Sequence, residues 1–264
     1  MEKLIILGTG NAQALQCYNT CFALQKGDDY FLIDAGGGNA ILSQLEKAAI
    51  PLTAIGHMFV SHTHSDHILG AVWMVRMVAA AQAQGKYAGD FHLYAHQECM
   101  DALQTMVNLT VKSKLAAHMG KSIVLHTLSD GQTESILGDD IIFFDIGSTK
   151  CKQFGFAIGK DFCFLGDEPY REHEEKYAKG TRWLLHEAFC RYADRDVFKP
   201  YEKHHATVKE ACETAQKLSA KNLILYHTED KHIKERKALY QREGAAFFSG
   251  TLYVPDDLEA FDLA

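Results

Sequence analysis

Three histidines and an aspartate fall within six residues of segment 61–70, which reads SHTHSDHILG. The segment directly follows an apolar run that predicts a strand. Side chains alternate between the two faces of an extended chain, so we expect His62, His64 and Asp66 to converge on one side. His67 comes next, at the start of a predicted helix, where the chain turns and adds a fourth side chain from another direction.

This combination of side chains is typical of a metal site. Imidazole nitrogens with one carboxylate suit Zn²⁺, Mn²⁺ or iron, and a carboxylate between histidines favours two adjacent ions over one closed tetrahedral site. The alternative is a polar loop that is rich in histidine by chance, because the chain has 14 histidines in 264 residues. The pattern H-x-H-x-D-H after a strand is far more specific than a lone histidine, and therefore predicts a metal centre.

Hydrophobic periodicity predicts an alternation of strands and helices along the chain. Segment 68–119 should be mostly helical, interrupted at 85–90 and by a strand at 91–94. The glycines at 36–38 are interpreted as a close packing point beside the metal loop; a phosphate cradle is the alternative. The other predicted strands are 3–7, 19–24, 30–33, 141–144, 154–158, 162–165, 183–189 and 222–227, and the other predicted helices are 39–49 and 207–219.

On these motifs the chain resembles the metallo-β-lactamase superfamily and, within it, the ribonuclease Z-like branch. The resemblance runs along nearly the whole chain and implies an α/β protein of the four-layer αββα sandwich type. Residues 1–264 are expected to form a single metallo-β-lactamase-like hydrolase domain, since no low-complexity tract or block of charge marks a linker.

The resemblance also extends the metal site into the second half of the chain. Asp167 follows the predicted strand 162–165, where the superfamily carries the aspartate that bridges two metals; simple turn chemistry is the alternative. His227 ends the predicted strand 222–227, where the family places a ligand of the second metal. The implied ligands hold two zinc ions, or manganese or iron in their place: His62, His64, Asp66, His67, Asp167 and His227.

One departure from the family pattern concerns the loop before the predicted strand 154–158. The ribonuclease Z-like branch places a further histidine there, which completes the first metal's ligands. Residues 145–150 read DIGSTK here, so Gly147 or a neighbour occupies the ligand's place. Water, Asp145 or a distant residue could substitute, and we expect a weak first site.

The implied mechanism is hydrolysis by a metal-bound hydroxide. Two ions about 3.5–4 Å apart polarise a phosphoryl or acyl oxygen and lower the pKa of a bridging water to about 7. Asp66 would orient the attacking hydroxide. His205 resembles the family's catalytic histidine that donates a proton to the leaving oxygen, and Glu187 would accept from its other ring nitrogen. The alternative for His204 and His205 is a polar pair at a helix start.

Substrate size follows from a missing segment. Ribonuclease Z enzymes that mature tRNA carry a long arm before the bridging aspartate, whereas only eleven residues, 156–166, separate Gly155 from Asp167. The net charge of −7 does not favour RNA binding either. Small phosphodiesterases of this branch that cleave cyclic phosphates also lack the arm. We therefore predict a phosphodiesterase for a small or cyclic phosphodiester. Lactone or thioester hydrolysis, or a nonenzymatic metal-binding protein with an eroded first site, are the alternatives.

The cysteines and the overall hydropathy bear on compartment and partners. Seven cysteines form no C-x-x-C pair, and no signal peptide or membrane-spanning apolar run is present, which is typical of reduced thiols in a cytoplasmic protein. Cys17 and Cys21 are interpreted as structural. The expected partner is a small-molecule substrate, with no tRNA and no membrane, and the chain could form a homodimer.

Overall fold

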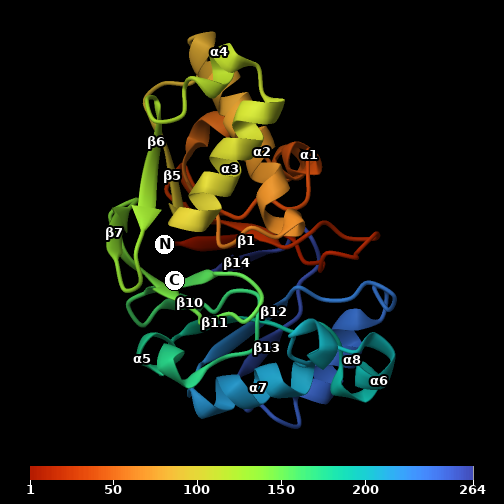
Figure 1. Ribbon diagram of the computed structural model, residues 1–264. Helices are drawn as coiled ribbons and strands as arrows, with labels where there is room; N and C mark the ends of the chain where they lie inside the picture. Colours follow the sequence, from red (N-terminus) through yellow and green to blue (C-terminus); the bar gives the residue numbers. More distant parts are fainter. Residues whose placement is uncertain (264) are drawn as a thin grey trace.

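Two β-sheets packed face to face form the centre of the computed structural model, which describes residues 1–263. Helices α1 to α4 cover the outer face of one sheet, and α5 to α8 cover that of the other, so the layers stack as helices, sheet, sheet, helices (Figure 1). This arrangement confirms the predicted α/β class and the four-layer αββα sandwich.

The first sheet is built by the first half of the chain and closed by its last strand. Its strand order is β14-β1-β2-β3-β4-β5-β6; β1 pairs antiparallel with β14 and β2, and β3 to β6 run parallel. The elements are β1 (Lys3–Gly8), β2 (Cys21–Lys26), β3 (Asp29–Ile33), β4 (Ile55–Phe59), β5 (Phe91–His96), β6 (Ile123–Leu128) and β14 (Ala260–Asp262), with α1 (Ala40–Lys47), η1 (Leu52–Ala54), α2 (Ser65–Ala83), α3 (Gln97–Thr110) and α4 (Ser113–Ala116).

The second sheet has the order β13-β12-β11-β10-β9-β8-β7, with β10 to β13 parallel and the other pairs antiparallel. Its strands are β7 (Thr133–Ile136), β8 (Asp139–Asp145), β9 (Phe154–Ile158), β10 (Phe162–Phe164), β11 (Trp183–Glu187), β12 (Asn222–Tyr226) and β13 (Thr251–Tyr253). Its helices are η2 (Glu172–Glu174), α5 (Glu175–Ala178), η3 (Tyr192–Asp194), α6 (Arg195–Phe198), η4 (Tyr201–Lys203), α7 (Val208–Lys217) and α8 (Arg236–Gly244).

Alternation along the strands divides the core into layers. In β2, Phe22 and Leu24 face the other sheet, whereas Cys21 and Ala23 face the helices above. The layer between the sheets is rich in aromatic rings; Phe59, for example, lies 4.9 Å from Phe143 between ring centroids. Because both faces of each sheet are covered, central strands such as β9, β10 and β12 are almost continuously apolar, whereas the outer strands β6 and β7 carry polar residues along their length.

The start of α2 differs from the prediction. The helix begins at Ser65 and not at residue 68, with His64 as its extended N-cap residue. Asp66 therefore lies in the first helical turn, and the expected alternation of faces ends at His64. An aspartate in the first turn is favoured there, because its charge complements the free N–H groups of the helix start.

No helix within residues 1–263 is both long enough and apolar enough to cross a membrane. In the same part of the chain the seven cysteines are all free thiols.

Candidate metal centre

The carboxyl ends of parallel strands from both sheets carry the candidate site. In the first sheet, β3 leads into Asp34 and β4 into the loop with His62 and His64. In the second, β10 leads to Asp167 and β12 to His227. Ligand sites in open α/β sheets lie beyond the carboxyl ends of the strands, and here two such edges face each other.

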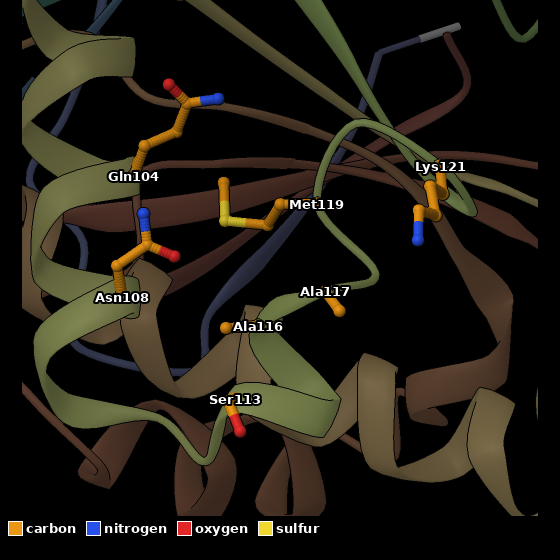
Figure 2. Close-up of a pocket in the computed structure, with 7 residues that line it drawn as sticks. All are labelled: Gln104, Asn108, Ser113, Ala116, Ala117, Met119 and Lys121. Carbon is orange, nitrogen blue, oxygen red and sulfur yellow. The ribbon is translucent and has the colours of Figure 1, made fainter.

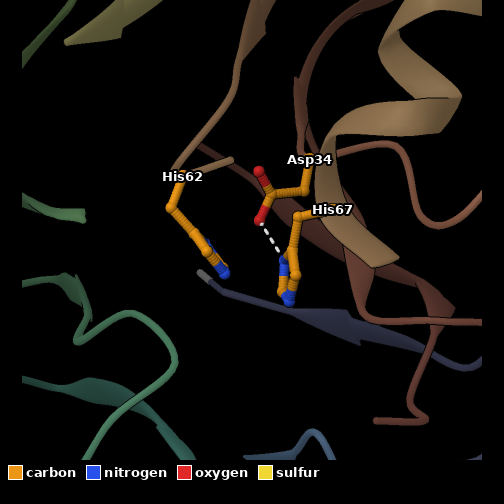
Figure 3. A group of neighbouring side chains, drawn as sticks. All are labelled: Asp34, His62 and His67. Atoms are coloured by element: carbon orange, nitrogen blue, oxygen red, sulfur yellow. Dashed lines mark hydrogen bonds and ion pairs between the residues drawn. The ribbon is translucent and has the colours of Figure 1, made fainter. Parts of the chain in front are cut away.

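A buried carboxylate that the sequence analysis did not single out holds the His loop in place. Asp34 accepts hydrogen bonds from the backbone N–H of Ser61 at 2.8 Å, from its hydroxyl at 2.7 Å and from Nδ1 of His67 at 2.8 Å (Figure 3). A carboxylate at neutral pH only accepts, so Nδ1 of His67 donates a proton to Asp34 and Nε2 is the ring nitrogen that faces the site.

The same carboxylate sets the ring of His62 through one intermediate group. The Ser61 hydroxyl donates to Asp34 and therefore accepts from Nδ1 of His62, 2.9 Å away. The Nε2 lone pair of His62 is thereby turned toward the site as well. Asp34 could have been suspected from its place at a strand end before a glycine turn, but no local spacing links it to His67.

Close backbone packing brings the helix start to this loop. A Cβ on Gly70 would lie 1.8 Å from the carbonyl oxygen of Ala35, so only glycine lets α2 approach that closely. A Cβ on Gly36, where φ is +67°, would lie 2.5 Å from the ring of Tyr18, and one on Gly37 would lie 2.6 Å from Oδ1 of Asn19. Gly36 and Gly37 therefore are close packing points, but against Tyr18 and Asn19 and not against the metal loop itself.

The six predicted ligands form two neighbouring groups. In the first, Nε2 of His62 lies 3.0 Å from Nδ1 of His64. In the second, Oδ2 of Asp66 lies 3.4 Å from Nε2 of His67 and 3.3 Å from Nε2 of His227. Asp167 completes the first group, with His62 and His64. In this group, and in that of Asp66, His67 and His227, the ligand atoms lie within 4.8 Å of one another.

Asp167 lies between the two groups. Its Oδ2 is 3.6 Å from Nε2 of His62 and 3.5 Å from Nε2 of His67, and its Oδ1 is 3.0 Å from Nδ1 of His227. The carboxylate therefore faces nitrogen donors of both groups, which is the position a bridging ligand needs.

The residues fit a metal ion on chemical grounds. Buried atoms of the site converge without well-formed hydrogen bonds within the described chain: Nε2 of His67 and Nδ1 of His205 have no partner, and Nδ1 of His227 faces Oδ1 of Asp167 only as an ion pair at 3.0 Å. Buried polar atoms in folded proteins are almost always satisfied, so this convergent set fits a site for a cation. Imidazole nitrogens at 3.0 Å, as in His62 and His64, can share one ion with bonds of about 2.0–2.1 Å. The donor set suits zinc, manganese or iron.

Charges within the site support this reading. Burial disfavours charge on Asp167, but His227 and His205 outweigh it and hold the pKa of this carboxyl well below its usual range. Burial opposes the imidazolium of His227, yet Asp167 and Asp66 raise its pKa to about 9. The carboxylates are thus ionised at neutral pH, and a metal would displace protons from the histidines.

His205 and Glu187 reach the same site. Nδ1 of His205 lies 3.7 Å from Oε2 of Glu187 and 3.8 Å from Oδ1 of Asp167, and its ring stacks on Phe189 at 4.9 Å between centroids. Oε1 of Glu187 accepts a hydrogen bond from the backbone N–H of Ala206. The expected hydrogen bond between the two side chains is absent at 3.7 Å, although they remain in ion-pair contact.

Comparison with known proteins places this chain. Residues 2–249 match the protein family described as "Anti-Pycsar protein Apyc1". The chain belongs to this family. A curated relative named Ribonuclease Z, from Bacteroides fragilis, is 22% identical over 310 residues, with 98% of this chain and 99% of the relative covered.

Solved structures agree on the fold. The metallo-β-lactamase fold protein YhfI from Bacillus subtilis superposes with a TM-score of 0.79 at 19% identity, covering 99% of both chains. A diphosphatase from the PhnP family gives 0.78 at 17% identity, covering 99% of this chain and 97% of that chain. Together with the curated relatives, these matches confirm a ribonuclease Z-like protein of the metallo-β-lactamase superfamily.

This Apyc1-family chain differs from the ribonuclease Z-like pattern in the loop between β8 and β9. A Cβ on Gly147 would lie 2.9 Å from the ring of His173, outside the ligand groups. Asp145 accepts from the backbone N–H of Gly147 and lies 4.0 Å from Lys152, so it also stays away from the ligands. Within the described residues, Asp145, the one substitute named from the sequence, therefore does not replace the missing histidine.

Two other side chains of this loop do reach the site. Sγ of Cys151 lies 3.5 Å from Nε2 of His64, and Nζ of Lys150 lies 3.4 Å from Nε2 of His205. Sequence reasoning missed both residues, because a lone cysteine and a lone lysine in a loop carry no spacing signal.

A hollow away from the metal centre lacks its chemistry. Figure 2 shows Gln104 and Asn108 of α3 facing Met119, and the hollow that they line has a volume of about 510 Å³. Its lining contains a single lysine and no histidine, cysteine or carboxylate. The volume of a hollow therefore does not by itself locate the candidate metal centre in this Apyc1-family chain.

Proposed function

We propose that this protein is a metal-dependent hydrolase that cleaves a small or cyclic phosphodiester. The observation that carries the proposal is the Asp167 carboxylate, which faces nitrogen donors of two groups while His205 stands beside it. Paired ions with an adjacent acid suit the displacement of a leaving oxygen from phosphorus. The names of the relatives, a ribonuclease and a diphosphatase, support chemistry at phosphorus.

Each side chain has a proposed role that follows from its position. The ligands would be His62, His64, Asp66, His67, Asp167 and His227, holding zinc, manganese or iron. When bound, such ions polarise a phosphoryl oxygen and lower the pKa of water. Asp66 directs Oδ2 at His67 and His227, which leaves Oδ1 to accept a proton from the attacking water.

His205 would donate the proton that the leaving oxygen needs. Its Nδ1 lies 3.8 Å from Oδ1 of Asp167 and 3.7 Å from Oε2 of Glu187, so Nε2 is the ring nitrogen that would carry the proton to the leaving oxygen. The stacked ring of Phe189 holds the imidazole of His205 in one orientation. The carboxylate of Glu187, which lies beside the same ring, acts as a second positioning residue.

The substrate is proposed to be small because the fold offers no arm for a large RNA. β9 and β10 form a tight hairpin in which Ile158 pairs with Phe162. The alignment with the Bacteroides fragilis relative spans 310 residues, compared with 264 in this chain, so that relative carries additional segments. The net charge of −7 would also repel a polyanion.

A turnover screen tests the proposal. The purified chain, loaded with zinc or manganese, is assayed on bis(p-nitrophenyl) phosphate, five- and six-membered cyclic phosphodiesters, a lactone and a thioester. We expect metal-dependent cleavage of the phosphodiesters and its abolition by a chelator. If only the lactone or the thioester were hydrolysed, the protein would be a hydrolase of carbonyl esters and not a phosphodiesterase. Efficient processing of precursor tRNA at physiological salt would refute the small-substrate assignment.

A further inference from the structure

We propose that Lys150 binds a nonbridging oxygen of the substrate's phosphoryl group and makes the site selective for anionic esters. The inference rests on the proposed function and names a substrate-contacting residue for it. Lys150 belongs to the loop in which the ribonuclease Z-like pattern has its additional metal-binding histidine. The loop thus brings an ammonium group to the site in place of an imidazole.

The contacts of Lys150 place its charge at the reacting end of the site. Nζ lies 3.4 Å from Nε2 of His205 and donates to the backbone carbonyl of Lys203 at 3.2 Å. An ammonium group has three N–H donors and no acceptor, so donors remain for a substrate oxygen beside the one that bonds to Lys203. The opposite ring nitrogen of His205 faces Asp167, so the ammonium stands across the ring from the metal ligands.

The same loop also contacts the first ligand group. Sγ of Cys151, the residue directly after Lys150, lies 3.5 Å from Nε2 of His64. The loop therefore reaches both His64 and His205, and a phosphoryl group bound between these histidines would lie beside Lys150.

The loop is anchored so that this position is maintained. Glu168, directly after Asp167 and 1% exposed, accepts hydrogen bonds from the hydroxyl of Ser148 at 2.6 Å and the backbone N–H of Thr149 at 3.2 Å. Arg171 contacts the same carboxylate at 3.2 Å. A buried carboxylate that binds two successive residues fixes the backbone immediately before Lys150, which is itself only half-exposed.

The chemistry of the group decides which ligand it can recognise. A protonated lysine cannot coordinate a metal, but it is a strong hydrogen-bond donor to an anionic phosphoryl oxygen. A lactone or an aryl acetate carries no such charge before attack. The substitution of a ligand by a cation therefore favours substrates that bring their own negative charge, as a phosphodiester does.

The test uses the full chain with its metal content checked by elemental analysis. Lys150→Met and Lys150→Arg are compared with Lys152→Met, a matched control in the same loop whose side chain pairs with Asp145. Each variant is assayed on anionic bis(p-nitrophenyl) phosphate and on neutral p-nitrophenyl acetate, and its affinity for inorganic phosphate is measured by calorimetry.

We expect Lys150→Met to lose about 10- to 100-fold in phosphate affinity and in kcat/KM for the phosphodiester, the usual worth of a hydrogen bond to a charged group. Acetate turnover and metal content should stay unchanged, Lys150→Arg should recover part of the loss, and Lys152→Met should match wild type. Unchanged phosphate affinity, an equal loss on both esters, or a loss of metal would overturn the inference. A wild-type chain inactive on every phosphodiester would instead refute the proposed function, while the phosphate affinities would still decide the role of Lys150.

Discussion

Asp34 accepts a hydrogen bond from Nδ1 of His67 at 2.8 Å, and this contact leaves Nε2 of His67 directed at the carboxylates of Asp66 and Asp167. The same carboxylate also fixes the ring of His62 through the Ser61 hydroxyl. One buried aspartate therefore orients a proposed ligand in each of the two groups without entering either as a bridging residue.

This relationship predicts the effect of Asp34→Asn. Asparagine tolerates the positive φ of 53° at this position, so the backbone should be retained. Its single amide oxygen cannot serve all three donors that the carboxylate accepts, and its NH₂ group would face one of them. We expect metal affinity to fall about 10- to 100-fold, the usual cost of losing such an orienting partner, with little change in circular dichroism. Wild-type affinity in a competition titration with a chromophoric chelator would contradict the orienting role.

Asp167→Ala tests the bridging position directly. Because the carboxylate faces His62 and His67 from one oxygen and His227 from the other, its removal should weaken both ligand groups at once. Elemental analysis should therefore find less metal in the purified variant than in wild type. Glu168→Gln, at the next position but directed at Ser148 and Thr149, is the control for damage to the loop. An unchanged metal content in Asp167→Ala would remove the bridging assignment.

The two metals should differ in lability. His62 and His64 share Asp167 as their third partner, whereas Asp66, His67 and His227 form a complete group of their own to which Asp167 adds. Titration with a chelator should remove one ion readily and the second at a higher concentration. Two equally tight ions would mean that another side chain completes the ligands of the first ion. Sγ of Cys151 lies 3.5 Å from Nε2 of His64, so Cys151→Ser would be the first variant to make in that case.

Short-range spacing predicted only part of the site. His62 and His64 belong to one short motif after an apolar strand, which places them at one edge of a sheet, whereas His227 was predicted from the resemblance to the family. The predicted start of α2 was wrong, because Ser65 and Asp66 are polar and therefore do not fit the apolar periodicity of a helix. They nevertheless favour its first turn, where a negative charge complements the helix dipole.

Other features depend on contacts between distant residues. Asp34 is separated from His67 by 33 positions, and Lys150 from His205 by 55, so no spacing rule connects either pair. The short strands β13 and β14 were missed for the same reason: each has three residues and forms only by pairing with a distant strand. Tertiary packing decides such elements, and local propensity does not.

A histidine outside the metal centre should make stability depend on pH. Burial, with His92 and His126 nearby, lowers the pKa of His57 to about 4. The neutral ring is therefore favoured in the fold, while the unfolded chain takes up a proton near pH 6.5. The contribution of neutral His57 to the free energy of unfolding should be fully present above pH 6.5 and lost as the pH falls from 6.5 toward 4. Denaturant midpoints at pH 7.5 and 5 should show a smaller difference for His57→Gln than for wild type; equal differences would assign the pH effect to other groups.

The last prediction concerns His205 and Glu187, which separate an enzyme from a metal-binding relic. If phosphodiester hydrolysis is the function, His205→Ala should keep its fold but lose about 10²–10⁴-fold in rate, the usual worth of a positioned acid or base. Because His205 lies in one group with Asp167 and His227, metal content must be measured first; a drop would make His205 a ligand.

Glu187→Gln should lose less than His205→Ala. Its carboxylate lies 3.7 Å from Nδ1 of His205, and the amide would keep an acceptor for the backbone N–H of Ala206 while removing the negative charge beside the ring. The comparison needs a substrate with a poorly activated leaving group, since p-nitrophenolate departs with little proton donation. If wild type and His205→Ala hydrolyse that ester equally slowly with metal in place, the general-acid assignment fails. The position of His205 beside Asp167 would then serve metal binding alone, because no other described imidazole stands beside Asp167 without belonging to the six proposed ligands.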